Sequence, residues 1–145
     1  MLIIKPIKFT GCNKEGDFSW MIKREINALF IYNDNIESKN SSTNGFGNAC
    51  VREYNINGNL EVPKSAGIPT GSYIFRGFKS LTQENKKYID DSIDVIKTLI
   101  KTYKYSSVYY SCESPDSKLI GDSLFKVGQD VKEYITEEIW KLITL

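Results

Sequence analysis

Apolar and polar residues along this chain form blocks that predict strands alternating with helices. Strand-like stretches occupy residues 2–10, 28–32, 65–71 and 107–112. The stretch 28–32, Ala-Leu-Phe-Ile-Tyr, is apolar without interruption, which is typical of a strand buried on both faces of a parallel sheet. Pro6 lies in the first stretch and has no backbone N–H, so it predicts an edge position or a break in that strand.

The longest predicted helix covers about residues 82–103. Its apolar residues, among them Ile89 and Ile93, recur at three- and four-residue steps, which predicts an amphipathic helix with one broad face against a sheet. Ser80 followed by Gln83 fits a capping box at its start.

Three shorter helical segments complete the pattern. Asp17 or Ser19 can cap a short helix that follows the first strand, and Asp130 can cap the last helix. Residues 47–54 are compatible with a short helix inside a small insert between the second and third strands.

The order is therefore strand, helix, strand, small insert, strand, helix, strand, helix. This alternation predicts an α/β fold, in which a mostly parallel central sheet carries helices on both faces. We expect a single three-layer domain over residues 1–145.

Composition narrows the class of partner. The net charge of +1 gives no basic face for nucleic acid, and no apolar run approaches the roughly 18 residues of a membrane span. Cys12, Cys50 and Cys112 are odd in number and scattered, so we expect reduced thiols and a cytoplasmic protein. The many Lys, Asn, Ile and Tyr residues are typical of an AT-rich bacterial or phage genome, and the cytoplasm would be that of the host in the second case. The oligomeric state is not predicted.

The chain contains no histidine. This removes the commonest general base, the usual metal ligand and every Ser-His or Cys-His nucleophile pair. We therefore expect no metal and no cofactor, and any chemistry must use carboxylates, hydroxyls, thiols and backbone amides.

Polar and glycine residues follow the predicted strands at the points where they end. Parallel strands bring all their carboxyl ends to one edge of a sheet, so one crevice would receive these groups. Glycine admits close backbone approach, and neutral donors suit a diphosphate between two sugars, so the sequence predicts a pocket for a small nucleotide derivative. In chain order the strand ends carry Gly11 and Asn13, then Asn33 to Asn35, then Thr70 and Gly71, then Ser111 and Glu113.

Each of these features also has a purely structural explanation. Residues 33–35, Asn-Asp-Asn, fit a turn or helix cap equally well, and the Gly45 and Gly47 pair fits a flexible turn. Tyr73 and the aromatic residues after it fit core or surface packing. Only the coincidence of several such loops at one edge favours a ligand site.

Three stretches together resemble the macrodomains, which bind ADP-ribose, and in particular the short divergent macro-like proteins carried by phages. They are Asn-Ala-Leu-Phe-Ile-Tyr-Asn-Asp-Asn at 27–35, Gly-Phe-Gly-Asn-Ala at 45–49 and Ile-Pro-Thr-Gly-Ser-Tyr at 68–73. The resemblance implies a macrodomain-like fold.

The resemblance also implies roles for individual residues. Asn33 and Asn35 would contact the distal ribose, and Asp17 would receive the adenine amino group. The backbone of the glycine loop, Gly45, Phe46, Gly47, Asn48 and Ala49, would wrap that ribose and one phosphate. Thr70, Gly71 and Tyr73 would clamp the diphosphate.

Three functions fit these observations. The first is binding of ADP-ribose or a related nucleotide, with hydrolysis if Asn35 positions a water and Asp34 or Glu113 acts as base. The second is sequestration of a nucleotide second messenger without cleavage, as a phage would use against a host defence. The third is a protein-interaction scaffold without ligand, in which Tyr73 and its aromatic neighbours form the interface.

Overall fold

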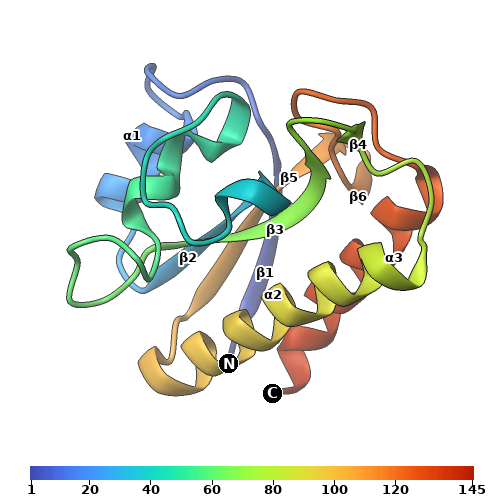
Figure 1. The fold of residues 1–145 in the computed structure, drawn as a ribbon. Coiled ribbons are helices and arrows are strands. Elements are labelled where there is room, and N and C mark those ends of the chain that lie inside the picture. Colours follow the sequence, from blue (N-terminus) through green and yellow to red (C-terminus); the bar gives the residue numbers. More distant parts are fainter.

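The computed structural model describes residues 1–145 as one sheet with helices on both of its faces (Figure 1). Its helices are α1 (Phe18–Arg24), α2 (Gln83–Tyr103) and α3 (Gln129–Trp140), with short 3-10 segments η1 (Ile36–Ser38), η2 (Gly47–Tyr54) and η3 (Lys141–Thr144). Its strands are β1 (Ile3–Lys8), β2 (Ala28–Asn35), β3 (Ser65–Ser72), β4 (Arg76–Gly77), β5 (Ser107–Ser114) and β6 (Ser117–Ile120). No helix combines the length and the apolar character needed to cross a membrane.

The six-stranded sheet is mostly parallel, as the sequence predicts. Its order is β1-β5-β2-β3-β4, with β6 pairing to β5 off this path. The pairs β1–β5, β5–β2 and β2–β3 are parallel, whereas the short strands β4 and β6 are antiparallel to their neighbours. Pro6 lies in β1, which has a partner on one side only, so the predicted edge position is confirmed.

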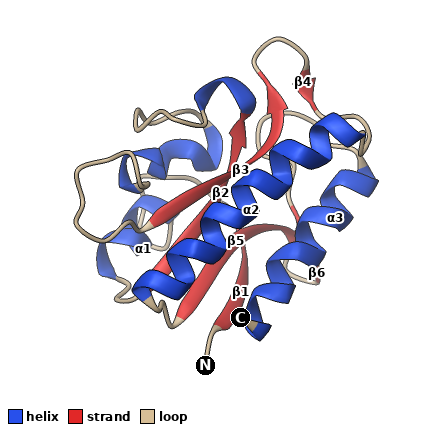
Figure 2. Ribbon diagram, turned by 60° about the horizontal axis from the view of Figure 1, so that its bottom comes forward, coloured by secondary structure: helices blue, strands red, loops and turns tan.

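Strand β2 divides the interior because alternate side chains enter two separate cores. Leu29 and Ile31 enter the larger core, which α2 and α3 cover. Phe30 enters the smaller core on the opposite face, beside α1 and η2, where its ring stacks on that of Tyr109 with centroids 4.6 Å apart. The continuous apolar run is therefore explained by burial on both faces (Figure 2).

Two helix caps differ from the prediction. Thr82 caps α2, because its hydroxyl accepts a hydrogen bond from the Asn85 amide at 3.1 Å, so the capping box at Ser80 is wrong. Asp130 lies inside the first turn of α3 and accepts from the Leu81 amide at 2.8 Å. It therefore joins the start of α3 to the segment before α2.

The strands run further than their apolar content predicts. β2 continues through the polar residues 33–35, which pair with β3, and β5 continues to Ser114. Backbone pairing tolerates polar side chains. A prediction from apolar content alone therefore places the ends of these strands too early. The two short strands β4 and β6 were not predicted.

The cysteines require a correction. The structure joins Cys12 and Cys50 in a disulfide with Cα atoms 6.4 Å apart, so the prediction of reduced thiols holds only for the buried Cys112. The disulfide links the loop after β1 to η2. A cytoplasmic location stays a prediction.

We expect the unfolded protein to show one reactive thiol without reductant and three with it. Replacing Cys12 and Cys50 by serine should lower the free energy of unfolding by about 3–4 kcal/mol, because the bridge closes a loop of 38 residues in the unfolded chain. Thiol titration and urea unfolding measure the two effects. Three reactive thiols without reductant would show that the bridge does not form.

Candidate functional site

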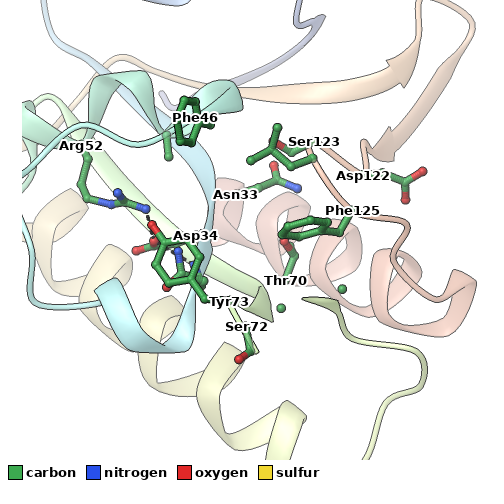
Figure 3. Close-up of a pocket in the computed structure, with 15 residues that line it drawn as sticks. Asn33, Asp34, Phe46, Arg52, Thr70, Ser72, Tyr73, Asp122, Ser123 and Phe125 are labelled. Carbon is green, nitrogen blue, oxygen red and sulfur yellow. Dashed lines mark hydrogen bonds and ion pairs between the residues drawn. The ribbon is translucent and has the colours of Figure 1, made fainter. Parts of the chain in front are cut away.

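A hollow lies at the carboxyl ends of β2 and β3, where open α/β sheets bind their ligands (Figure 3). We call it the central hollow. Its volume is about 50 Å³, which is enough for one or two water molecules. It is lined by Asn33, Asp34, Asn35, Phe46, Ala49, Arg52, Thr70, Gly71, Ser72, Tyr73, Gly77, Asp122, Ser123, Leu124 and Phe125.

The structure brings together about half of the residues that the sequence singled out. Asn33, Asp34, Asn35, Phe46, Ala49, Thr70, Gly71 and Tyr73 line the central hollow. Gly11, Asn13, Asp17, Gly45, Gly47, Asn48 and Glu113 do not.

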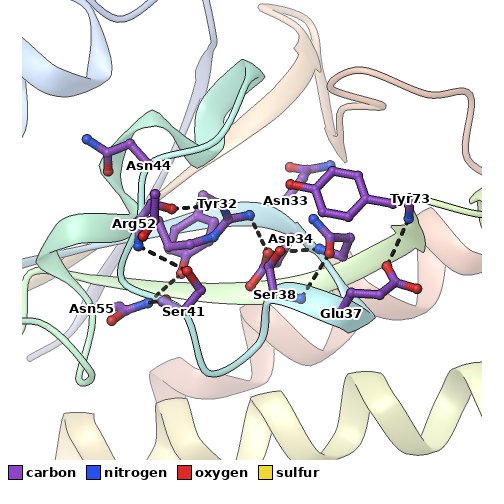
Figure 4. Close-up of polar contacts among 12 residues, drawn as sticks. Tyr32, Asn33, Asp34, Glu37, Ser38, Ser41, Asn44, Arg52, Asn55 and Tyr73 are labelled. Atoms are coloured by element: carbon purple, nitrogen blue, oxygen red, sulfur yellow. Dashed lines mark hydrogen bonds and ion pairs between the residues drawn. The ribbon is translucent and has the colours of Figure 1, made fainter.

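A buried ion pair forms the floor of this edge. Arg52 of η2 donates from Nη2 to Oδ1 of Asp34 in β2 at 2.6 Å, and each side chain is only 4% exposed (Figure 4). Nη1 of Arg52 also donates to the Thr43 carbonyl at 3.0 Å, so the pair holds the loop between η1 and η2. Nε of Arg52 is buried without a hydrogen-bond partner.

Two glycines make room for this ion pair. A Cβ on Gly45 would lie 2.6 Å from Nη1 of Arg52, and a Cβ on Gly67 would lie 2.7 Å from Oδ2 of Asp34. Cβ atoms essentially never approach other atoms this closely, so a side chain at either position would have to shift the pair. Gly45 is thus explained by packing within the chain.

The environment of Asp34 raises its pKa and engages one of its two carboxylate oxygens. Burial raises the pKa of its carboxyl, while the charge of Arg52 and hydrogen bonds from Arg52 and the Asn35 amide oppose that shift. Oδ1 accepts both of these hydrogen bonds, and Oδ2 lies against Gly67. Oδ1 is therefore engaged, whereas Oδ2 accepts no hydrogen bond from the chain.

Asn33 acts as a junction between three segments. Its amide N–H donates to Oδ1 of Asn48 at 2.7 Å, and Nδ2 of Asn48 donates to its Oδ1 at 3.0 Å. Its own Nδ2 donates to the Gly121 carbonyl at 2.9 Å. These bonds tie β2 to η2 and to the end of β6, and they leave one N–H and one lone pair of Asn33 for a ligand.

Glu37 fastens η1 to the end of β3. Its carboxylate accepts from the Ser72 hydroxyl at 2.6 Å and from the Tyr73 amide at 2.9 Å. Desolvation opposes the effect, yet these hydrogen bonds lower the pKa of Glu37. Asn35 caps η1 by accepting from the Ser38 amide at 3.0 Å, so its side-chain oxygen is already engaged.

Asp17 closes its own loop. Its carboxylate accepts from the Lys14 amide and the Thr10 hydroxyl, both at 2.8 Å, and these bonds lower its pKa. Gly11 has a φ of +148°, and a Cβ there would lie 3.0 Å from Oδ2 of Asp17. Gly11 therefore leaves room for the Asp17 carboxylate inside this loop. The contact of Asp17 with adenine stays a prediction.

Glu113 lies beside the central hollow in an ion pair with Lys132. Lys132 is buried and bonds to Glu113 at 2.9 Å and to Asp122 at 3.0 Å. Burial alone would lower the pKa of Lys132, but these two carboxylates raise it. Asp122 thereby positions the segment 122–125 that forms one wall of the hollow.

Three aromatic rings lie at the mouth of the central hollow, and two of them are exposed. Phe46 is 81% exposed and Tyr73 is 57% exposed, although both lie above buried polar groups such as Thr70. Phe125 comes from the opposite wall (Figure 3). Rings from three separate loops thus converge on one polar floor.

Sequence reasoning missed the residues that complete the hollow from distant segments. Arg52 is the cation that a buried Asp34 requires, and that requirement was the signal that could have found it. The wall formed by residues 122–125 left no signal, because only the pairing of β5 with β6 brings it here.

We predict that Arg52→Met lowers the free energy of unfolding by about 3–5 kcal/mol, because it leaves the Asp34 carboxylate buried without its cation. Urea denaturation measures the loss. Adding Asp34→Leu to this variant should recover most of it. The exposed Lys101→Met is the matched control, and an equal loss in that control would contradict the role of the pair.

We also predict a pH-dependent role for Glu37. Because its folded pKa is lowered, the stability it contributes is fully present above its ordinary pKa of 4.5 and disappears as pH falls through the folded value. Wild type should therefore be more stable than Glu37→Gln at pH 7, and the two should converge in acid. A difference that persists unchanged into acid would show that the carboxylate charge is not responsible.

No group of three or more His, Cys, Asp or Glu side chains is arranged to hold a metal ion. Comparison of the chain with protein-family models, with curated proteins and with solved structures finds no match.

Proposed function

We propose that this protein binds a nucleotide derivative of the ADP-ribose class over the central hollow and holds it without cleaving it. The proposal depends on the convergence of two exposed rings, Phe46 and Tyr73, on a floor of buried polar groups at the carboxyl edge of the sheet. Such rings provide faces for a base, and hydroxyl and amide groups such as Thr70 provide partners for a sugar.

The size of the hollow limits how the ligand sits. At about 50 Å³ it is smaller than the roughly 300–1,000 Å³ of pockets that enclose a whole ligand. Only part of a nucleotide derivative fits inside, and the remainder would lie on the exposed rings above. The resemblance to macrodomains favours the same ligand class. We propose that the fold is macrodomain-like as well.

The contacts of the three proposed catalytic residues favour binding over hydrolysis. Asp34 is paired with Arg52 and packed against Gly67, whereas Glu113 is paired with Lys132 outside the hollow. Asn35 accepts a hydrogen bond from η1. A general base must reach a water molecule, and the ion pairs engage one oxygen of Asp34 and one oxygen of Glu113.

Isothermal titration of the protein with ADP-ribose tests the binding. Phe46→Ala should weaken affinity about tenfold or more, since base stacking on an aromatic ring contributes roughly 1–3 kcal/mol. Phe75→Ala is the matched control, because Phe75 is similarly exposed at 73% but does not line the hollow. Absence of heat with the wild type at millimolar ligand, or equal losses in both variants, would contradict the proposal.

The absence of cleavage has a separate test. After incubation and denaturation of the complex, chromatography should return intact ADP-ribose in the amount added. Recovery of hydrolysis products that depend on Asp34 or Glu113 would assign the protein to the enzymes instead.

A further inference from the structure

A second surface feature, a groove lined by several cationic side chains, lies next to the central hollow. It is an open groove of about 870 Å³ between β4, the segment before α2 and the segment 124–129. Four cationic side chains line it, Arg76, Lys79, Lys126 and Lys132, and no acidic residue does. We call it the basic groove.

Three of these cations are free to bind an anion. Arg76, Lys79 and Lys126 are exposed and take part in none of the ion pairs of the chain, whereas Lys132 is held by Glu113 and Asp122. The whole chain carries a net charge of only +1, so this concentration is a local property of the groove.

The walls of the groove are fixed by backbone contacts. A Cβ on Gly77 would collide with the Lys126 carbonyl, and a Cβ on Gly128 would collide with the Lys79 carbonyl. The Gly128 amide also donates to the Phe78 carbonyl at 2.7 Å. The backbones that carry Lys79 and Lys126 are therefore held at a constant separation.

The basic groove is continuous with the central hollow. Gly77, Leu124 and Phe125 line both, and the guanidinium of Arg76 lies 4.9 Å from the centre of the Phe125 ring. Phe125 stands at the mouth of the hollow next to Thr70, as Figure 3 shows. One ligand can therefore contact the polar floor and the free cations together.

We infer that the basic groove binds the phosphates of a ligand whose sugar lies over the central hollow. The hollow itself offers no free cation, because Arg52 is committed to Asp34. A diphosphate would find its charge partners at Arg76, Lys79 and Lys126, and not at the backbone of residues 45–49 as the macrodomain resemblance implies. This inference rests on the proposed function for the identity of the ligand.

Titration of the Lys79→Gln/Lys126→Gln double variant with ADP-ribose and with inorganic pyrophosphate tests the inference. Loss of two charge-assisted contacts should weaken ADP-ribose binding about tenfold or more and reduce its dependence on salt. Pyrophosphate binding should be lost. Lys23→Gln/Lys101→Gln removes the same charge from two exposed helix positions, and it should leave both ligands unaffected.

The outcomes separate this inference from the proposed function. If ADP-ribose binds wild type and the Lys79/Lys126 variant equally, the groove is not the phosphate site, although the central hollow keeps its ligand. If pyrophosphate alone binds, in a manner that needs Lys79 and Lys126, the anion site stands and the ADP-ribose proposal fails. If neither binds, or if a DNA oligonucleotide displaces pyrophosphate more effectively than ADP-ribose does, the inference is overturned.

Discussion

The carboxyl edge of this sheet depends on one buried ion pair. Asp34 lies next to the end of β2, a strand that is buried on both faces, and a carboxylate there is tolerated because Arg52 reaches it from η2. Two local features depend on that pair. Gly45 and Gly67 must lack side chains, and the loop between η1 and η2 is held through the Thr43 carbonyl. The pair thereby sets the position of η2, from which Phe46 and Ala49 reach the hollow.

The polar residues at this edge have structural partners before any ligand binds. Asn33 joins η2 and the end of β6, whereas Glu37 fastens η1 to the end of β3. A site built from engaged groups is preorganised, which favours affinity because little has to be ordered on binding. The same engagement works against turnover, because an ion pair holds one oxygen of Asp34 and another holds one oxygen of Glu113. The exposed cations of the neighbouring basic groove contrast with this, since Arg76, Lys79 and Lys126 take part in no ion pair within the chain.

Most of the fold could be predicted from the sequence, because burial on both faces of β2 and the helical spacing of Ile89 and Ile93 are local patterns. Prediction from the sequence failed where contacts between distant residues determine the structure. Residues 33–35 looked like a loop because they are polar, yet backbone pairing with β3 keeps them in the strand. The ion pair joins residues 18 apart, and the wall at 122–125 arrives through the β5–β6 hairpin. Neither leaves a periodic signal. The disulfide was missed because an odd cysteine count suggested free thiols.

We propose that the carboxyl edge of β2 and β3, together with the basic groove, forms one nucleotide site. A crystal structure of the protein soaked with ADP-ribose tests this most directly. We expect a ribose over the polar floor between Phe46 and Phe125, with the diphosphate near Arg76, Lys79 and Lys126. A ligand bound elsewhere, for example between α2 and residues 55–57, or no ligand at saturating concentration, would contradict it.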